Sequence, residues 1–474
     1  MLQHMKTLLF GILFIVSTYQ VGFSQQDIVF LNVNVISMRD SGIDMNRTVV
    51  VRNNRILSIE NFDSKKKYAK SRVVNGNGAY LIPGLFDMHM HFYYDFGLDK
   101  KFLKDEIKLP LVNGVTTVRI MNGRSEYLQL KTDISNGRTP GPEMFVASPQ
   151  LVGRWPFRDS LVGKIVTSAK EAEDAVKLFK TEGYDAIKIT TLVNPDAYNA
   201  IISTAEKENI KVTGHVGPLV RLDRALAAHQ QIEHFDEFIE TLLPDTSINH
   251  GNSVSDYGIW DRKRAWPTIE YVDEGKINGL AKKVKAANIY VTATNFFFTK
   301  YFAIGATKEE IEQFPQFNYV PAFMKKRADE SFSYYWNNPP SEELRKKYLR
   351  IRYKFVTALH SAGVKLMTGS DSPEWYLVPG FTIHDEIESF VKAGLSNYAA
   401  LQTATINPAE YLGINNRKGS VAVGKEADFI LLNKNPLEDI RYTRTILGVY
   451  SHGKFYDRAA LDQLLDEIKS FAKE

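Results

Sequence analysis

Apolar, strand-like runs alternate with helical segments between Leu85 and Gly413, and this alternation constrains the fold more than any other feature. A strand, a helix and a further strand form the repeating unit of parallel α/β folds. Eight repeats predict an α/β protein in which residues 83–413 fold as a (β/α)₈ barrel of the TIM type. The eight runs are LFDMHMH, TTVRIM, MFVAS, AIKIT, KVTGH, QQIEH, IYVTAT and KLMTGSD.

One helix between two of these runs shows the local signals well. Ser168 and Glu171 have the spacing of a capping box, which begins a helix, and Gly183 is placed to end it. Apolar residues recur at i, i+3, i+4 and i+7 between these ends, which predicts one buried helix face. The apolar residues are Ala172, Ala175, Val176 and Phe179.

Short strand-like runs at both ends of the chain differ from this pattern. Residues 25–82 include VVVRNNRILSI, where Asn53 and Asn54 predict a hairpin turn because asparagine tolerates a positive φ. Residues 414–457 contain similar short runs. We predict that the two stretches combine into one small flanking β-sandwich domain, and that residues 458–474 form a terminal amphipathic helix.

Residues 1–24 have the pattern of a signal peptide. Lys6 precedes the apolar run LLFGILFIV, which is shorter than the ~20 residues that span a bilayer. Gly22 and Ser24 are small and suit cleavage after Ser24. A buried N-terminal helix is the alternative, and the polar run SQQD that follows disfavours it. We expect an exported protein, periplasmic or secreted, with no membrane association after cleavage.

Composition narrows the class of partner. A net charge of +4 over 474 residues is too small to indicate nucleic acid, so we expect a small-molecule substrate. Aromatic residues make up 12% of the chain and are frequent in two long intervals, 241–278 and 296–350. Long loops above a barrel build substrate pockets and lids. Contact between the subunits of a homo-oligomer is the alternative role for these intervals.

Four of the eight runs end in residues that can bind a metal. The first ends in His89 and His91, whose i, i+2 spacing puts both side chains on one face of the strand. Three others end in His215, His234 and Asp371. Each alone has an ordinary explanation as a buried histidine or a helix cap, but together they mark the C-terminal mouth of a barrel, where active sites lie. Cysteine is absent, so only nitrogen and oxygen ligands are available.

Lys188 lies inside the apolar run AIKIT. Burying an ammonium group is unfavourable unless it is paired. Two interpretations stay open: a salt bridge to a carboxylate, or carboxylation of the amine by carbon dioxide to give an anionic bridge between two metal ions. Arg119, Arg154 and Arg158 are candidates for binding a substrate carboxylate, with ordinary basic surface residues as the alternative. His384 is a candidate for a contact to a metal ligand.

These residues lie in stretches that resemble the metal-dependent amidohydrolase superfamily. Within it, the chain is most similar to the imidazolonepropionase-like group, which includes Xaa-Pro dipeptidases similar to prolidase. The resemblance covers nearly the whole mature chain. The matching stretches are LIPGLFDMHMH, GVTTVR, GYDAIKI, VTGHV, IEH, GVKLMTGSDSP and AGLSNYAALQTATINPAEYLGINNRKGSVAVGKEADFILLNKNPLEDI.

The resemblance implies a (β/α)₈ barrel with a flanking β-sandwich and two divalent metal ions. Zn²⁺ is the expected ion for a set of nitrogen and oxygen ligands, with Mn²⁺, Co²⁺ or Fe²⁺ as alternatives. A hydroxide between the ions would attack the scissile carbonyl, while Asp371 would take up the proton and pass it to the leaving amine. The implied ligands are His89, His91 and Asp371 for one ion, His215 and His234 for the other, and carboxylated Lys188 as the bridge.

Three departures from the family pattern bear on the substrate. Ile120 follows GVTTVR, where the family often has Asp. The stretch TTLVNPD follows the bridging lysine, where group members often have a Gly-rich stretch. The known substrates of relatives are therefore a poor guide to the substrate of this chain. Pro218 stands where deaminases and imidazolonepropionases commonly place Glu, which argues against deamination and against opening of an imidazolone ring.

We therefore predict an exported, metal-dependent amidohydrolase that cleaves a C–N bond in a dipeptide or an N-acyl amino acid. A lactonase or phosphotriesterase on the same binuclear site is the first alternative. The second is a non-catalytic scaffold on the same fold. Loss of ligands would mark a scaffold, and all six ligand positions are filled here.

Overall fold

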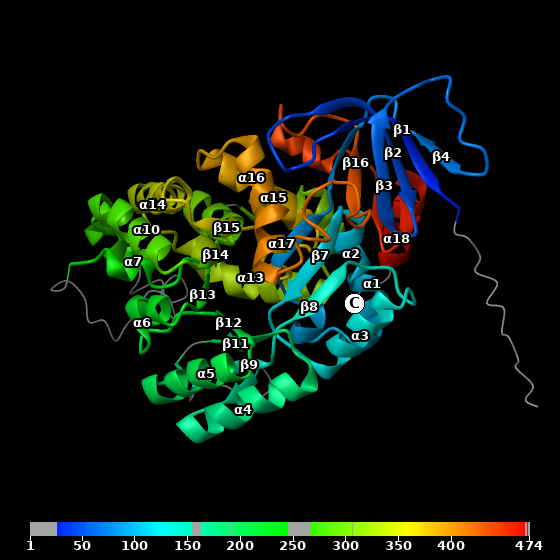
Figure 1. Cartoon of the computed structure of the whole chain (residues 1–474). Helices are drawn as coiled ribbons and strands as arrows, with labels where there is room; N and C mark the ends of the chain where they lie inside the picture. Colours follow the sequence, from blue (N-terminus) through cyan, green and yellow to red (C-terminus); the bar gives the residue numbers. More distant parts are fainter. Residues whose placement is uncertain are drawn as a thin grey trace, which may run out of the picture.

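Eight parallel strands surround the centre of the larger part of the molecule (Figure 1). The computed structural model describes residues 26–474 apart from 154–162, 191, 245–265, 306, 470, 471, 473 and 474. The predicted signal peptide, Arg154 and Arg158 lie outside the described residues. The eight strands follow the eight predicted runs in order: β6 (Leu85–Met90), β7 (Val115–Ile120), β8 (Glu143–Val146), β11 (Ala186–Ile189), β12 (Lys211–Gly214), β13 (Gln231–Glu233), β14 (Tyr290–Thr292) and β15 (Lys365–Met367).

The strands are hydrogen-bonded in two parallel sheets that meet at both edges. One sheet has the order β6-β7-β8, and the other continues from β11 through β12, β13 and β14 to β15. A parallel bridge between Ala147 and Ala186 joins β8 to β11. A second bridge, between Met90 and Ser372, joins β6 to the segment after β15, where the His91 N–H donates to the Ser372 carbonyl at 2.7 Å. The eight strands therefore follow one another around a ring, and the predicted α/β class is confirmed.

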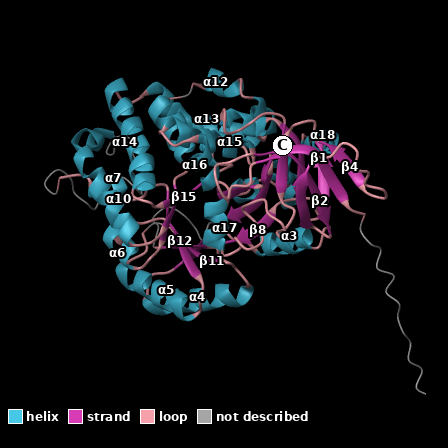
Figure 2. Ribbon diagram, turned by 45° about the horizontal axis from the view of Figure 1, so that its top comes forward, coloured by secondary structure: helices cyan, strands magenta, loops and turns pink. Residues whose placement is uncertain are grey.

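Helices cover the outside of this ring, as the strand–helix alternation predicts (Figures 1 and 2). In Figure 1, α4 and α5 lie along one side, and α10 and α14 along another. Apart from the helices between β14 and α14, which are described below, the described α-helices of the barrel are α1 (Leu103–Glu106), α2 (Lys108–Val112), α3 (Ser125–Ser135), α4 (Ala169–Glu182), α5 (Pro195–Lys207), α6 (Arg221–Ala227), α7 (Phe238–Thr241), α10 (Ile277–Ala286), α14 (Glu342–Ser361), α15 (Phe381–Lys392), α16 (Asn397–Thr403) and α17 (Ile406–Leu412).

Two segments of the barrel differ from a simple alternation. After β8 the chain forms two short parallel strands, β9 (Gln150–Val152) and β10 (Gly163–Ile165), which extend the sheet beyond β11 and which the sequence pattern did not predict. The described part of the interval 296–350 is largely helical. Its elements before α14 are α11 (Asn295–Phe297), η6 (Phe298–Ile304), α12 (Lys308–Glu312), η7 (Pro315–Tyr319) and α13 (Ala322–Asn337).

Strands from both ends of the chain form a separate eight-stranded sheet beside the barrel (Figure 2). A terminal helix, α18 (Arg458–Ile468), follows the last strand of this sheet. The strand order is β18-β17-β16-β5-β1-β2-β3, with β4 paired to β1. The strands are β1 (Ile28–Val35), β2 (Asp44–Arg52), β3 (Arg55–Asn61), β4 (Arg72–Asn75), β5 (Tyr80–Pro83), β16 (Phe429–Leu432), β17 (Ile446–Ser451) and β18 (Lys454–Asp457).

This flanking sheet separates two apolar cores. Successive side chains of a strand point to opposite faces, and all four residues of β16 are buried. Phe429 and Leu431 belong to a small core within the flanking domain, whereas Ile430 and Leu432 belong to the large core shared with the barrel. One face of the sheet therefore packs against the barrel, and the other face packs against the small core of the flanking domain.

The sheet also curls over its small core. β1 and β18 lie four places apart in the strand order, yet the rings of Phe30 and Phe455 are 5.0 Å apart and meet edge to face. Phe30 makes the same kind of contact with Phe429 at 5.0 Å. A single branched sheet thus takes on a sandwich-like shape. Among the described residues, no helix is both long and apolar enough to cross a bilayer.

Candidate metal centre

The structure brings the predicted site residues to one end of the ring. His89 lies in β6 and His91 directly after it, while His215 and His234 directly follow β12 and β13. Asp371 lies in the loop after β15, and the side chain of Lys188, in β11, is buried. The carboxyl ends of parallel strands meet at one mouth of a barrel. That geometry brings together residues that lie up to 282 positions apart in the chain.

The four imidazole rings form a row across this mouth. The ring centroids are 5.3 Å apart for His91 and His89, 4.6 Å for His89 and His234, and 4.8 Å for His234 and His215. The Nε2 atoms of His89 and His91 are 3.3 Å apart, as their shared strand face predicts. Asp371 Oδ1 lies 3.3 Å from Nε2 of His89 and 3.6 Å from Nε2 of His91.

Three of these side chains form a compact set of possible ligands. Among the described residues, His89, His91 and Asp371 each offer an atom that lies within 4.8 Å of the other two. His234 stands beside them, with Nδ1 3.8 Å from Asp371 Oδ2. His215 lies at the far end of the row. Ligation of metal ions by these residues stays a prediction here.

Each of three imidazoles has a hydrogen-bond partner at its Nδ1 atom. His89 Nδ1 lies 2.7 Å from Glu233 Oε2, and His215 Nδ1 lies 2.8 Å from Asp236 Oδ2. His234 Nδ1 lies 2.8 Å from the Thr294 hydroxyl. A hydrogen bond at Nδ1 orients the ring and leaves Nε2 free to bind a metal. None of these three partners was predicted from the sequence, although Glu233 lies inside the stretch IEH.

Lys188 is 1% exposed, and its Nζ atom has no hydrogen-bond partner. The described residues therefore offer it no salt bridge, which was one of the two open interpretations. Among the opposite charges, those of Glu233 and Asp371 act most strongly on the amine. An unpaired polar group in a buried place is costly, and such groups are typical of functional sites rather than of packed cores.

Burial controls the protonation of the site. It lowers the pKa of His89 and His234 well below the usual value, with repulsion from neighbouring cations as the second cause. The same two causes lower the pKa of His91 to about 3. Burial also lowers the pKa of Lys188 to about 8 and raises the pKa of Asp371 well above its usual range. Neutral imidazole is the form that binds a metal.

Three residues at the same mouth have an unusual backbone conformation. His234, Thr294 and Asp371 have φ values of 61°, 41° and 57°, in the left-handed region that side chains with a Cβ rarely adopt. Each stands just after the end of β13, β14 or β15. Such residues cost about 1–3 kcal/mol each and cluster where function requires a particular side-chain direction.

Two further sequence candidates have other roles. Arg119 was expected either to bind a substrate carboxylate or to lie on the surface, and both expectations are wrong. Its side chain is 2% exposed and lies inside the ring, where Nη2 donates to Glu233 at 2.6 Å. His384 does not contact the histidine row. Its two nitrogens bond to the Thr443 hydroxyl and the Asn113 carbonyl, each at 3.0 Å, which ties α15 to the flanking domain.

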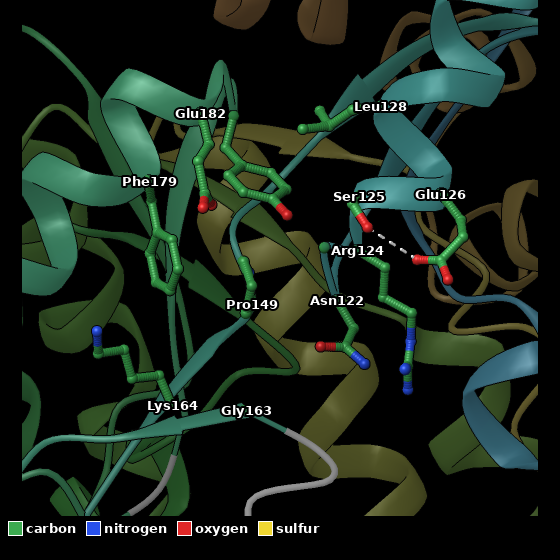
Figure 3. Close-up of a pocket in the computed structure, with 12 residues that line it drawn as sticks. Asn122, Arg124, Ser125, Glu126, Leu128, Pro149, Gly163, Lys164, Phe179 and Glu182 are labelled. Atoms are coloured by element: carbon green, nitrogen blue, oxygen red, sulfur yellow. Dashed lines mark hydrogen bonds between the residues drawn. The ribbon is translucent and has the colours of Figure 1, made fainter.

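A separate pocket of about 670 Å³ lies on the side of the barrel between α3 and α4 (Figure 3). Arg124 and Glu126 line one side, and Phe179 and Lys164 the other. None of the six predicted ligands lines it. Arg124 is already paired with Asp95 at 2.7 Å, so the pocket does not share the chemistry of the histidine row.

The fold and the site together define a class: a (β/α)₈ barrel that carries histidines, a buried lysine and a carboxylate at the C-terminal ends of its strands. Residues 80–456 match the amidohydrolase family. The chain belongs to this family, which confirms the superfamily that the sequence motifs indicated.

Comparison with known proteins finds partial sequence similarity to adenine deaminases and nearly complete similarity of fold to solved structures. Adenine deaminase from Clostridium perfringens is 24% identical over 188 residues, which are 36% of this chain and 30% of the deaminase, so the match spans less than a third of that relative. A putative prolidase from Bifidobacterium longum has a TM-score of 0.66 at 22% identity, covering 94% of this chain and 99% of its own. A bottromycin amidohydrolase has a TM-score of 0.72 at 20% identity, covering 94% and 90%. The two structures show similarity of fold.

Proposed function

We propose that this protein is a metal-dependent hydrolase that cleaves a C–N bond, an amide or peptide bond in a dipeptide or an N-acyl amino acid. The observation that carries the proposal is the convergence of four histidines, Asp371 and the unpaired Lys188 at one mouth of the barrel. Membership of the amidohydrolase family supports it. The fold shared with a putative prolidase supports an amide or peptide substrate.

The donor set fits two divalent metal ions. Carboxylation of Lys188 would replace its unpaired amine by an anionic group with two oxygens, suited to bridging two ions. Bound ions would polarise a carbonyl and lower the pKa of a bound water to about 7. Nitrogen and oxygen donors suit Zn²⁺, Mn²⁺, Co²⁺ or Fe²⁺. The residues that would hold the ions are His89, His91 and Asp371 for one, His215 and His234 for the other, and Lys188 for both.

The protein's own groups would supply proton transfer and exclusion of water. Asp371 carries a carboxylate at the centre of the row, within 3.6 Å of two imidazole nitrogens. There it would accept the proton of the attacking water and deliver it to the leaving nitrogen. The ring of Phe298 meets His234 edge to face at 5.8 Å, and the Phe298 side chain is buried. It would keep bulk water from that side of the reaction.

Release of amines from a library of dipeptides and N-acyl amino acids tests the proposal. The chain from Gln25 would be loaded with Zn²⁺ or Mn²⁺ in bicarbonate and compared with a sample treated with a chelator. We expect release that the chelator abolishes, ranked by substrate. Absence of release from protein shown to hold two ions would contradict the choice of bond, and hydrolysis of lactones or phosphotriesters by the same sample would identify the alternative.

Substitution of Asp371 tests its role as the group that moves the proton. Asp371→Asn keeps one oxygen but removes the base, so kcat should fall by about 10²–10⁴-fold with the metal content retained. Asp428→Asn is the matched control, because Asp428 is also a buried carboxylate but bonds to Thr116 and Lys418, away from the histidine row. Turnover retained by Asp371→Asn would assign the proton transfer to another group.

We also propose that the protein is exported and that residues 1–24 are removed. The short apolar run after Lys6 and the small residues at Gly22 and Ser24 support this. Expression of the full chain in a bacterium, followed by mass measurement of the exported fraction, should give a chain that begins at Gln25. A chain that keeps residues 1–24 and stays in the cytoplasm would contradict the proposal.

A further inference from the structure

Arg119 lies across the interior of the ring, below the histidine row. It comes from β7, and its guanidinium group donates to residues of two other strands, β6 and β13. Nε donates to the Met88 carbonyl at 2.7 Å, Nη1 to Gln231 Oε1 at 2.8 Å, and Nη2 to Glu233 Oε1 at 2.6 Å. A buried arginine with so many partners is held in one orientation. It therefore offers a fixed positive charge beneath the site.

Glu233 connects this arginine to a predicted metal ligand. Its side chain is 0% exposed. Oε1 accepts hydrogen bonds from Arg119 and from the Thr213 hydroxyl at 2.9 Å, and Oε2 accepts one from His89 Nδ1 at 2.7 Å. An ionised carboxylate only accepts hydrogen bonds, so His89 carries its hydrogen on Nδ1. The lone pair of a neutral His89 is then on Nε2, the atom that faces His91 and Asp371.

Arg119 holds Glu233 from the side opposite to His89. Oε1 is fixed by its bonds to Arg119 and Thr213, so Oε2 stays directed at His89 Nδ1. A hydrogen bond of this kind fixes the orientation and the tautomer of a metal-binding imidazole. The partners of His215 and His234, which are Asp236 and Thr294, have no arginine bonded behind them among the described contacts.

We propose that Arg119 and Glu233 act together as positioning residues that present Nε2 of His89 to a divalent metal ion. This inference rests on the proposed metal site. It assigns a function to a buried ion pair that neither touches the substrate nor binds the metal. It also gives a physical reason for the arginine of GVTTVR and the glutamate of IEH, which are separated by 114 positions.

Metal affinity tests the inference without the need for a substrate. Zn²⁺ binding would be measured by competition with a chromophoric chelator, and Co²⁺ would report coordination through its visible absorption. Glu233→Gln should bind the ion at His89 about 10–100-fold more weakly than the wild type, with a changed Co²⁺ spectrum. Asp428→Asn is the matched control, because Asp428 also pairs with a threonine hydroxyl and a buried cation. It should bind as the wild type does.

A double variant separates positioning from folding. Glu233→Gln leaves Arg119 buried without its charged partner, so the single variant is expected to be less stable. Arg119→Met combined with Glu233→Gln removes both charges and should regain most of the lost stability. The metal affinity should nevertheless stay at least 10-fold below that of the wild type.

Three outcomes decide the matter. Wild-type affinity in a folded Glu233→Gln protein would overturn the inference. Recovery of affinity together with stability in the double variant would also overturn it, because the pair would then serve only the fold. Failure of the wild type itself to bind Zn²⁺ or Co²⁺ would instead refute the proposed metal site, and the inference with it. If Glu233→Gln alone does not fold, the double variant still gives the deciding measurement.

Discussion

His384 and Lys188 are both buried, but they differ in whether their side-chain nitrogens have hydrogen-bond partners. His384 has a hydrogen-bond partner at each ring nitrogen, so its neutral form is fully satisfied. Lys188 has no hydrogen-bond partner at Nζ. A satisfied buried group stabilises a fold, whereas an unsatisfied one costs free energy that needs another explanation. The two residues therefore lead to opposite predictions.

Substitution of His384 should change how stability depends on pH. Burial lowers the pKa of His384 to about 3 from 6.5, with Arg444 as the second cause. Between these pH values the unfolded chain binds a proton that the folded chain does not. Stability therefore falls as the pH decreases from 6.5, by up to about 1.4 kcal/mol per pH unit. His384→Gln should remove this contribution to the slope.

Urea unfolding at several pH values between about 4 and 7 measures that slope. His360→Gln is the control, because it removes an exposed histidine on α14 by the same substitution. A His384→Gln protein with the wild-type slope would assign the acid sensitivity to other groups. The comparison uses the difference between variants, which cancels the contributions of other carboxylates and histidines.

Substitution of Lys188 should stabilise the metal-free fold and weaken metal binding. Lys188→Met fills similar volume without the amine that lacks a partner, so the metal-free protein should gain about 1–3 kcal/mol of unfolding free energy. The same variant should hold one ion rather than two after loading in bicarbonate. Denaturant unfolding and metal analysis measure the two effects. A marked loss of metal-free stability would show that Lys188 supports the fold.

At the scale of elements, helices and turns with side-chain signals at their ends formed as predicted. In α4, the Ser168 hydroxyl accepts from the Glu171 N–H and Gly183 has a φ of 90°. In the turn between β2 and β3, Asn53 and Asn54 have φ values of 49° and 59°. These signals act within a few residues of the chain. β9 and β10 had no such signal, because β9 is held by parallel pairing with β10 and β11.

Two glycine substitutions should have opposite effects. Gly183→Ala places a Cβ on a left-handed residue with no atom within 4 Å, so the cost of about 1 kcal/mol comes from the backbone alone. Gly279→Ala lies inside α10, also with open space around it, and should stabilise by about 0.5–1 kcal/mol through helix propensity. Denaturant unfolding compares the two. Equal signs would contradict the assigned end of α4.

At the scale of the whole molecule, the proposed ligands come from both sheets of the ring. β6 contains His89 and directly precedes His91, and β11 contains Lys188. β12 and β13 directly precede His215 and His234, and Asp371 follows β15. Metal ions bound at this mouth would link the two sheets, in addition to the backbone hydrogen bonds that join their edges. Ligand binding of this kind ties metal affinity to the stability of the entire barrel.

Removal of metal should therefore lower the melting temperature of the whole protein. A ligand at about 1,000 times its Kd stabilises the folded state by about 4 kcal/mol. Thermal melting of loaded and chelator-treated protein, at two Zn²⁺ concentrations, would measure the effect. Ca²⁺, which prefers oxygen ligands, is the control and should restore little. A melting temperature independent of Zn²⁺ would contradict a metal centre at the mouth.

The sequence by itself determined the order of the eight barrel strands and the positions of His89, His91, His215, His234 and Asp371 at or beyond their ends. Periodicity and strand ends are local properties, so one chain is enough to recognise them. Only the tertiary structure decided that Arg119 turns inward to Glu233 and that Glu233 reaches His89. These contacts join residues 114 and 144 positions apart. They depend on how the strands are placed around the ring, and local periodicity carries no information about that placement.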